Sequence, residues 1–279
     1  MRFKLYRQHG ALNSPEIFNA FQQGLLAQGH QVVDSNEDVA VIWSVLWNGR
    51  MAPNQHIYEK CVRENKPILI IEVGNLLRNT TWRICLNHIN GLGEFGVEEN
   101  LDPDRPKKLG VKLKPINENR HKEILIATQH QKSLQWKGMP SMADWTLKTI
   151  DEIRKYTDRT IVIRPHPRSV FDRTEFLDYE FETPQKISDT YDDFDLKFSY
   201  WTTVNYNSAG PAIQSLIQGC PVIVNETSLA YPCSNKYTDL DNPVIPDRTQ
   251  WYVEIAHTEY TVDEIRSGHW YDRLQWAIG

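Results

Sequence analysis

The chain has 279 residues, of which 40% are hydrophobic and 24% are charged, and its mean hydropathy is −0.54. This composition is typical of a folded globular protein and excludes collagen-like and low-complexity chains, and no apolar run reaches the ~18–20 residues of a membrane span. The net charge of −5, from 31 basic and 36 acidic residues, excludes a wholly basic nucleic-acid binder but leaves a local basic face open.

The cysteine spacing and the first residues bear on the cellular compartment. Four cysteines are scattered along the chain and form no CxxC pair. This spacing indicates reduced, partly buried thiols and not a zinc site. The segment from Met1 to His9 lacks the apolar stretch that secretion signals carry. We therefore expect a cytoplasmic protein.

Strand and helix signals alternate along the first half of the chain, which is typical of a parallel α/β sheet. Asn13 and Ser14 followed by Pro15 predict a helix start, because Asn and Ser cap helices and Pro suits the first turn. In chain order we expect a strand at 3–6, a helix ending near residue 28, strands at 32–33 and 39–43, a helix at 54–65 and a strand at 68–73.

The segment 99–123 is rich in basic residues and prolines, and we interpret it as the crossover between two halves. A second series follows, with strands expected at 124–127, 160–164, 203–205 and 221–224 and helices at 142–156, 208–218, 249–257 and 262–265. The acidic segment 171–195 is expected to pack around one or two short strands. The pattern predicts two doubly wound α/β domains with a cleft between them, in which ligands bind at the carboxyl ends of the strands.

The most specific motif is Arg-Pro-His-Pro-Arg at 164–168, which directly follows a predicted strand. Each proline fixes its φ angle near about −65°, so the loop is rigid. The guanidinium groups of Arg164 and Arg168 match phosphate oxygens, and His166 can donate a hydrogen bond to one. A rigid surface turn would explain a lone histidine, but the cluster at a strand end favours a phosphate site.

A second motif begins at Asn205, where a predicted strand runs into a turn of small residues and then a helix. Asn207 and Ser208 can cap that helix. Its first N–H groups, at Ala209 and Gly210, form the kind of helix terminus that binds a pyrophosphate. Ordinary capping explains the same residues.

Two further loops carry polar side chains near these motifs. After the strand at 124–127, Ser133 and Gln135 lie at the same sheet edge, and Trp136 can either stack on a base or pack on its own domain. Glu226 follows the strand at 221–224. Acidic side chains hold ribose hydroxyls in other nucleotide sites, although a solvated Glu is the alternative.

The order of these motifs resembles the nucleotide-sugar domain of GT-B glycosyltransferases, which have two Rossmann-like α/β domains facing a cleft. The likeness is to the His-Pro and Ser motifs of capsule-polymer and sialic-acid transferases and covers residues 120–235. It implies that His166 and Ser208 bind the phosphates of a nucleotide-sugar donor, expected to be a UDP-sugar, with Arg164 assisting and Glu226 near the ribose. The chain has Gln214 and Ser215 where many such enzymes have Glu-Ala, which puts Gln214 in doubt as a donor-binding position.

The whole chain also resembles a group of proteins encoded in tailed-phage genomes. The likeness lies in three stretches, which begin at Tyr6, Asp34 and Trp82. The bacteriophage context implies DNA modification, with a 5-hydroxymethylpyrimidine such as 5-hydroxymethylcytosine in double-stranded DNA as the acceptor, in the cytoplasm of the infected host. The implied domains are an acceptor-binding domain at 1–115, a nucleotide-sugar-binding domain at 116–250 and closing C-terminal helices at 251–279.

The first half would then supply a general base, which an inverting transfer needs near the acceptor hydroxyl. Glu72 ends an apolar strand and precedes Gly74, so it can face the cleft, although a salt-bridged Glu is the alternative. His9, which follows the first strand, is a rival. Asp38 is another rival, but it precedes its strand and would lie at the far end of it.

Acceptor binding is predicted for four side chains that follow strands: Arg7, Trp43, Trp47 and Arg50. The two tryptophans can stack on a flipped base or on a sugar, although Trp43 also suits the core. Basic residues between 105 and 122 can contact DNA phosphates, but charge runs are commonly solvated. The acidic segment Asp189–Asp195 does not match a calcium loop, and no metal is expected.

Three alternatives stay open at this point. The same fold can use a capsule, cell-wall or lipopolysaccharide acceptor. A nucleotide-sugar epimerase would act on the donor alone and need no acceptor. A DNA-binding accessory protein would show salt-dependent DNA binding and no affinity for nucleotide sugars. The oligomeric state does not follow from these patterns.

Overall fold

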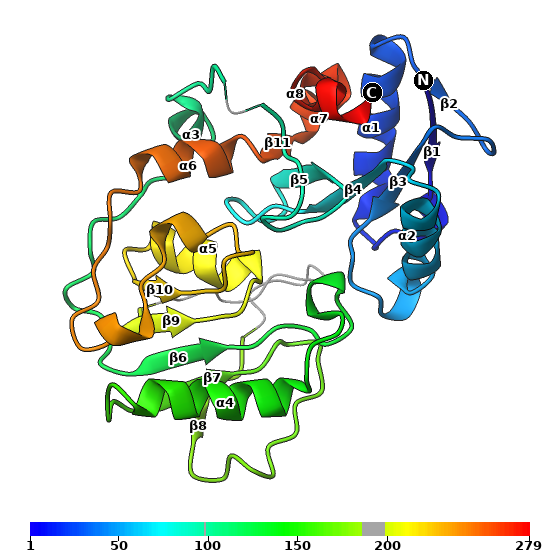
Figure 1. Cartoon of the computed structure of the whole chain (residues 1–279). Coiled ribbons are helices and arrows are strands. Elements are labelled where there is room, and N and C mark those ends of the chain that lie inside the picture. The colour runs from blue at the N-terminus through cyan, green and yellow to red at the C-terminus, as the bar shows by residue number, and fades with distance from the viewer. Residues whose placement is uncertain (98, 186–198) are drawn as a thin grey trace. The chain divides into compact units, whose positions relative to one another are not determined.

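The computed structural model describes residues 1–97, 99–185 and 199–279, and these divide into two compact units (Figure 1). Unit 1 contains residues 1–109 and 253–279, and unit 2 contains residues 110–252. The chain passes from one unit to the other between residues 109 and 110 and again within helix α6, Thr249–Ala256. Each unit has a sheet of its own.

Unit 1 is built on a six-stranded sheet with the order β11-β5-β4-β3-β1-β2. Its strands are β1 (Arg2–Leu5), β2 (Gln31–Val32), β3 (Val39–Trp43), β4 (Ile68–Val73), β5 (Thr81–Leu86) and β11 (Glu259–Thr261). The first four are parallel, as the sequence predicted. Strands β5 and β11 were not predicted and run antiparallel to their neighbours, so the expectation of a wholly parallel sheet is wrong at this edge.

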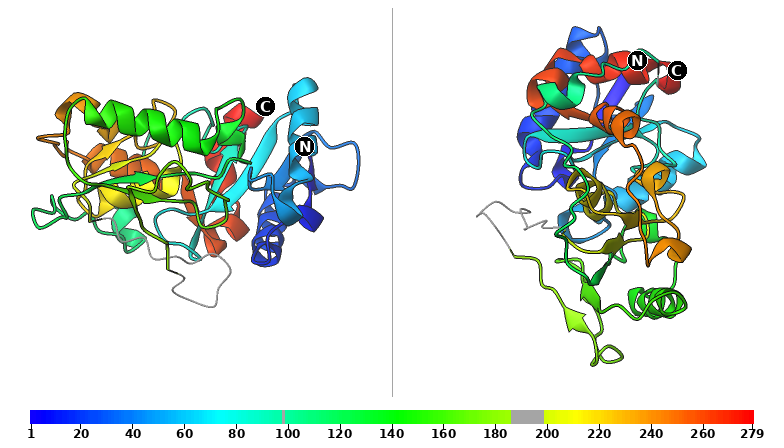
Figure 2. Two further views of the ribbon diagram at one scale, coloured as in Figure 1. Left: turned by 90° about the horizontal axis from the view of Figure 1, so that it is seen from below. Right: turned by 90° about the vertical axis from the view of Figure 1, so that its left-hand side faces the viewer.

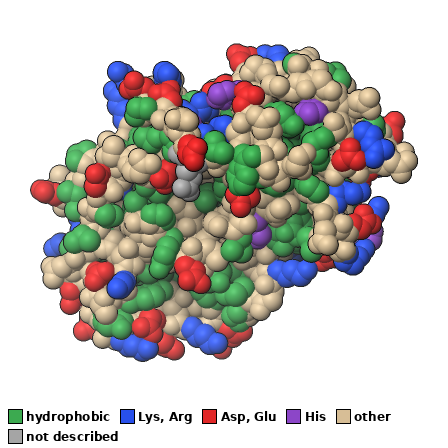
Figure 3. Space-filling view, turned by 45° about the horizontal axis from the view of Figure 1, so that its top comes forward, with side chains coloured by type: hydrophobic (Ala, Val, Ile, Leu, Met, Phe, Trp, Pro, Cys, Tyr) green, Lys and Arg blue, Asp and Glu red, His purple; other side chains and the backbone are tan. Residues whose placement is uncertain are grey.

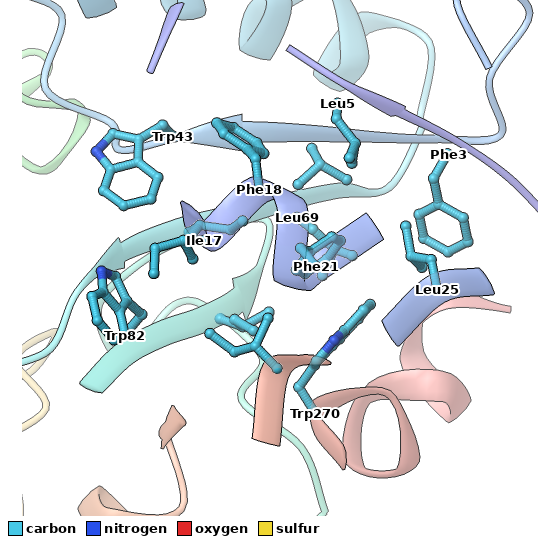
Figure 4. Packing of buried hydrophobic residues seen from close by; sticks show 14 of the residues in the cluster. Phe3, Leu5, Ile17, Phe18, Phe21, Leu25, Trp43, Leu69, Trp82 and Trp270 are labelled. Carbon is cyan, nitrogen blue, oxygen red and sulfur yellow. The ribbon is translucent and has the colours of Figure 1, made fainter. Parts of the chain in front are cut away.

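Helices cover both faces of the unit 1 sheet. Helix α1 (Ser14–Ala27) lies on one face and α2 (Asn54–Arg63) on the other (Figure 2). The helices α7 (Val262–Ser267) and α8 (His269–Ile278) pack beside α1, where Trp270 stacks on Phe21 with ring centroids 4.3 Å apart (Figure 4). Gly24 permits this close packing, because a Cβ there would lie 2.3 Å from the carbonyl oxygen of Ile265.

Unit 2 is built on a five-stranded, fully parallel sheet with the order β10-β9-β6-β7-β8. Its strands are β6 (Ile124–Ala127), β7 (Ile161–Arg164), β8 (Glu180–Phe181), β9 (Thr202–Val204) and β10 (Val222–Ile223). Helix α4 (Met142–Arg154) packs on the face that carries Ile124 and Ile126. Helix α5 (Ala209–Ile217) covers the opposite face, where Ser215 donates a hydrogen bond to Thr203 at 2.9 Å.

Most predicted elements are present within one or two residues of their expected ends. The remaining elements are short: α3 (Arg105–Lys108) and 3-10 turns at Arg7–His9, Gly49–Met51, Leu134–Trp136, Tyr231–Cys233 and Tyr237–Asp239. The acidic segment 171–195 was expected to hold one or two short strands. Among the described residues it contains β8, and Asp189–Asp195 lies outside the described residues. None of the helices in the described ranges combines the length and apolar character that crossing a bilayer demands.

Both sheets contain a point where the direction of strand addition reverses. In unit 1 the chain adds β2 on one side of β1 and then β3 on the other. In unit 2 it adds β7 and β8 on one side of β6 and then β9 on the other. Loops that leave the carboxyl ends of the strands at such a switch point diverge and leave a crevice, which is where open α/β sheets bind ligands.

Candidate functional site

At the switch point of unit 2, the loops after β6 and β9 are locked together by amide side chains. Gln129 donates from Nε2 to Oδ1 of Asn207 at 3.0 Å, and its Oε1 accepts from the backbone N–H of Asn207 at 3.2 Å. Gln135 donates to the carbonyl oxygen of Asn207 at 2.9 Å, and Asn205 donates to that of Ala127 at 2.7 Å. Because Gln129, Asn205 and Asn207 are buried, these bonds fix the position of Asn207, two residues before α5.

The start of α5 lacks the side-chain cap that the sequence suggested. Ser208 is the N-cap residue, yet its hydroxyl makes no capping hydrogen bond. The other predicted cap, Asn207, uses its Nδ2 to donate to the hydroxyl of Thr227 at 2.9 Å. The first turn, at Ala209 and Gly210, therefore keeps N–H groups that no side chain caps. Such a terminus carries a partial positive charge and is suited to an oxyanion.

The Arg-Pro-His-Pro-Arg loop is tied to the same place. The backbone N–H of His166 donates to the hydroxyl of Thr128, at the end of β6, at 3.0 Å. His166 in turn accepts at Nδ1 from the backbone N–H of Arg168 at 3.2 Å. The predicted convergence of the loops after β6, β7 and β9 is therefore present within unit 2.

Arg164 has a different place from the one the sequence suggested. Its side chain is buried and forms an ion pair with Glu182, with 2.5 Å between Nη2 and Oε1. Glu182 also accepts from the hydroxyl of Tyr200 at 2.5 Å. This arrangement connects β7 to the segment after β8. The guanidinium group of Arg164 is therefore paired with a carboxylate of unit 2 instead of facing the predicted phosphate site.

Sequence reasoning missed His130, which the structure places beside His166. The two rings meet edge to face with centroids 5.2 Å apart, and His130 is 6% exposed. Burial lowers the pKa of His130; a backbone hydrogen bond with Arg168 acts in the opposite direction, and the charges of Arg168 and Lys132 lower the pKa further. The sequence contained a signal for this pair. His130 lies three residues after the end of β6 at Ala127, and His166 lies two residues after the end of β7 at Arg164. Ala127 and Arg164 are paired across these two strands.

The other residues predicted to bind the nucleotide-sugar donor are spread around this edge of the sheet. Ser133 accepts at its hydroxyl from the N–H of Gln135 at 3.3 Å, Arg168 is half-buried, and Glu226 is exposed after β10. Trp136 is buried and donates to the carbonyl oxygen of Pro140 at 2.8 Å. Of the two roles considered for Trp136, packing within its own domain is therefore the correct one.

The carboxyl edge of unit 1 holds a serine–carboxylate pair. Ser44 Oγ donates to Oε2 of Glu72 at 2.6 Å, at the point where β3 ends beside β4. Ser44 has a φ of 61°, in the left-handed region that non-glycine residues rarely adopt. Its N–H donates to the carbonyl oxygen of Ile71 at 2.8 Å, and this bond and the one to Glu72 hold it there. Strained residues of this kind cluster at functional sites.

Asn54 connects the two loops at the unit 1 switch point. It is fully buried and donates from Nδ2 to the carbonyl oxygens of His9 at 3.2 Å and Trp43 at 2.7 Å. The candidates His9 and Glu72 therefore belong to loops at the same edge of one sheet. Asp38 does not, because it precedes β3 and pairs with Arg2 at 2.7 Å, which holds the pKa of Asp38 down at about 2.

Two of the predicted acceptor-binding residues are occupied in the fold. Trp43 is 1% exposed and belongs to the core cluster, so its prediction as a stacking surface is wrong (Figure 4). Arg7 donates to side chains of α1, at 2.7 Å to Asn19 and at 2.5 Å to Gln22. Trp47 is half-buried, with its ring 5.8 Å from that of Tyr58, and Arg50 is exposed.

Of the basic residues between 105 and 122, three are engaged within the fold and four are exposed, at Lys107, Lys112, Lys114 and Lys122. Arg105 is buried, pairs with Glu264 at 2.6 Å and donates to two backbone carbonyl oxygens, while Lys108 pairs with Asp102 at 2.6 Å. Arg120 lies over the ring of Trp201 at 4.3 Å. On the face shown in Figure 3, lysine and arginine side chains alternate with aspartate and glutamate.

The thiols match their prediction, since all four cysteines are buried and outside any disulfide: Cys61, Cys85, Cys220 and Cys233. Within the described ranges, no three or more His, Cys, Asp or Glu side chains are grouped so that they could hold a metal ion.

Comparison with known proteins gives matches in structure but not in sequence. No protein-family model and no curated protein matches this chain. The β-Kdo 2,4-transferase of Thermosulfurimonas dismutans KpsC is similar with a TM-score of 0.48 and 12% identity, over 91% of this chain and 89% of that chain. The β-Kdo 2,7-transferase of the same KpsC gives a TM-score of 0.49 and 13% identity, over 96% of this chain and 98% of that chain. At these values no residue role transfers from those proteins to this chain.

Proposed function

We propose that the protein is a glycosyltransferase that moves a sugar from a nucleotide-sugar donor to an acceptor hydroxyl. The observation that carries this proposal is the edge of unit 2, where three loops and the uncapped start of α5 bring hydrogen-bond donors together at a switch point. The motif resemblance to GT-B glycosyltransferases supports the same assignment. A UDP-sugar is the proposed donor.

In the proposed reaction, unit 2 binds the phosphates that leave. The N–H groups at Ala209 and Gly210 and the side chains of Ser208 and His166 donate hydrogen bonds to the phosphate oxygens. Charge develops on these oxygens as the bond from the anomeric carbon to the phosphate breaks. Fixed donors at that position stabilise the transition state more than the bound substrate, which is the requirement for catalysis.

Unit 1 is proposed to activate the acceptor. Glu72 takes the proton of the acceptor hydroxyl as its oxygen bonds to the anomeric carbon. Ser44 donates to Oε2 and the N–H of Val73 donates to Oε1 at 3.0 Å, which holds the carboxylate in place, and each oxygen still has a lone pair that can take the acceptor proton. His9, from the neighbouring loop, is the alternative base.

The class of acceptor is a separate proposal. We propose a hydroxymethylated base in double-stranded DNA, and a capsule or cell-wall glycan is the second candidate. Arg105 and Lys108 are paired with carboxylates, whereas Lys107, Lys112, Lys114 and Lys122 are exposed and supply the positive charge that a DNA acceptor needs.

The test is mass spectrometry of acceptors incubated with the protein and a panel of nucleotide sugars. The acceptors are hydroxymethylcytosine DNA, hydroxymethyluracil DNA, unmodified DNA and a set of capsule oligosaccharides. A gain of one sugar mass on a hydroxymethylated base supports the DNA acceptor, and a gain on an oligosaccharide supports the glycan acceptor. Conversion of the donor alone indicates an epimerase, and no binding of any nucleotide sugar contradicts the proposal.

A further inference from the structure

We propose that His130 is a second phosphate ligand, which donates a hydrogen bond from Nε2 to an oxygen of the anionic group bound beside His166. This inference rests on the proposed function for the identity of the ligand, but its geometric basis is independent. None of the sequence motifs assigns a role to this side chain.

The backbone fixes which ring nitrogen of His130 carries the proton. Nδ1 accepts a hydrogen bond from the N–H of Lys132 at 3.1 Å. A nitrogen that accepts a hydrogen bond carries no proton, so in the neutral ring the proton is on Nε2. Burial favours the neutral ring by lowering the pKa of His130. Nε2 is therefore a hydrogen-bond donor.

Within the described residues that donor makes no hydrogen bond of normal distance and angle, although the backbone of Arg168 lies near enough to the ring to raise its pKa against the effect of burial. Nε2 of His130 is buried and makes no hydrogen bond there, although the whole residue is 6% exposed. Leaving a buried donor unpaired is costly, and a bound ion or a catalytic role is among the explanations for such a group. Burial alone does not leave a histidine nitrogen without a hydrogen bond. His257 is 5% exposed, yet its Nδ1 contacts the carbonyl oxygen of Val253 at 2.7 Å and its Nε2 accepts from the N–H of Asp102 at 3.1 Å.

The position of His130 connects the two parts of the proposed phosphate site. Its neighbour Gln129 holds Asn207, two residues before the first residue of α5. Its ring meets that of His166 at 5.2 Å, and Thr128 binds the N–H of His166. Since β6 lies between β7 and β9, the loop with His130 lies between the loop with His166 and the loop that leads into α5.

The two histidines also share one local geometry. In each, Nδ1 accepts from the backbone N–H two residues further along, at 3.1 Å for His130 and 3.2 Å for His166. Each neutral ring then has its proton on Nε2. Two donors of the same kind from neighbouring strands match a group with several acceptor oxygens, such as a phosphate, better than a single hydroxyl.

The experiment compares His130→Phe, His130→Gln and wild type in the full chain. Phe keeps a planar ring but has no donor, whereas the Gln amide keeps an N–H. The control is His30→Phe in unit 1, since Nε2 of His30 also has no partner among the described residues but its ring packs against Phe3 and Tyr271. Calorimetric titration measures the affinity for UDP and for inorganic pyrophosphate, and circular dichroism and thermal unfolding check that each variant is folded.

The expected result is at least a roughly tenfold weaker affinity of His130→Phe for both probes. His130→Gln is expected to retain most of the affinity, and His30→Phe all of it. Long-range ¹H–¹⁵N spectra of histidine-labelled wild type are expected to show the Nε2–H tautomer for His130 and a shift of that nitrogen when pyrophosphate binds.

The outcomes separate this inference from the proposed function. If His130→Phe is folded and binds UDP as wild type does, the inference is overturned and the donor site stands. If wild type binds no nucleotide but pyrophosphate shifts the Nε2 resonance, His130 is an anion ligand and the donor assignment fails. If neither probe moves that resonance, or if the spectra show the Nδ1–H tautomer, the inference is overturned.

Discussion

The two units place different polar groups at equivalent positions of similar sheets. At the carboxyl edge of unit 1 the characteristic group is a carboxylate, Glu72, which accepts from Ser44. At the carboxyl edge of unit 2 the characteristic groups are hydrogen-bond donors, from the uncapped start of α5 and from two histidines whose Nδ1 atoms accept from the backbone.

This difference shows that the doubly wound topology determines where a ligand can bind but not which chemistry takes place there. Both switch points are held by a buried amide, Asn54 in unit 1 and Gln129 in unit 2. The groups beside each amide then decide what can bind. An edge with a carboxylate suits the removal of a proton from a hydroxyl, and an edge with several N–H donors suits the binding of an oxyanion.

The largest expected effect comes from neutralising the carboxylate of Glu72 at the unit 1 edge. Glu72→Gln keeps the shape but cannot take a proton, so turnover is expected to fall by about 10²–10⁴-fold while donor affinity stays unchanged. Steady-state kinetics and donor titration measure the two quantities. Asp38→Asn is the matched control and is expected to keep full turnover, because Asp38 pairs with Arg2 at the other end of β3. Equal loss in both variants would contradict the role of Glu72.

The next effect comes from adding negative charge to the unit 2 edge. Ser208→Asp places a carboxylate at the uncapped start of α5, where it caps the helix and repels phosphate. We expect roughly 100-fold weaker UDP binding together with an unchanged or higher melting temperature. Ser208→Asn, which caps without charge, is expected to lose less affinity. A purely structural role for Ser208 predicts no loss of binding in the more stable variant.

A moderate effect is expected when the buried amides are removed. Gln129→Leu and Asn54→Leu each leave backbone or side-chain groups unpaired, at a cost of about 1–3 kcal/mol in the free energy of unfolding. Chemical denaturation measures that cost. Gln129→Leu should also weaken UDP binding, because Asn207 loses its position, whereas Asn54→Leu should lower turnover without changing UDP affinity. The same functional defect in both variants would remove the distinction between the two edges.

The smallest effect concerns acid sensitivity. Burial lowers the pKa of His88 in unit 1 from 6.5 to about 4. Between these values the unfolded chain binds a proton that the folded chain does not. The contribution of His88 to stability is therefore complete above pH 6.5 and is lost as the pH falls toward 4. We expect a decrease of about 1–2 kcal/mol in the free energy of unfolding over this interval, measured by urea titration at stepped pH. His88→Phe is expected to reduce the decrease.

Much of the fold could be predicted from local sequence. Apolar runs such as 68–73 and 124–127 mark buried parallel strands, and both are present as expected. The strand Thr81–Leu86 was missed although its sequence carries a signal, because Trp82, Ile84 and Leu86 alternate with Thr81, Arg83 and Cys85 as in an antiparallel strand. Strand β11 depends on pairing with β5, about 180 residues earlier in the chain, which no local pattern shows.

The site was predictable to the level of loops and not of individual side chains. The motif at 164–168 and the turn at 205–210 lie at the predicted edge. The partner of Arg164 is Glu182, and only the folded chain brings the two together. Trp43 was assigned to acceptor binding although core packing decides its environment, whereas Asp38 lies at the far end of its strand, as the sequence indicated.

The division of unit 1 between the two ends of the chain orders events during synthesis. Residues 110–252 form a complete unit and leave the ribosome before residues 253–279, which supply β11, α7 and α8 to unit 1. Until then Phe21 lacks its stacking partner Trp270, and Gly24 lacks the turn of α7 that packs on it. The nascent N-terminal segment therefore exposes the part of α1 that later contacts α7 and α8 while unit 2 folds, and we expect this surface to be a site of chaperone binding during synthesis.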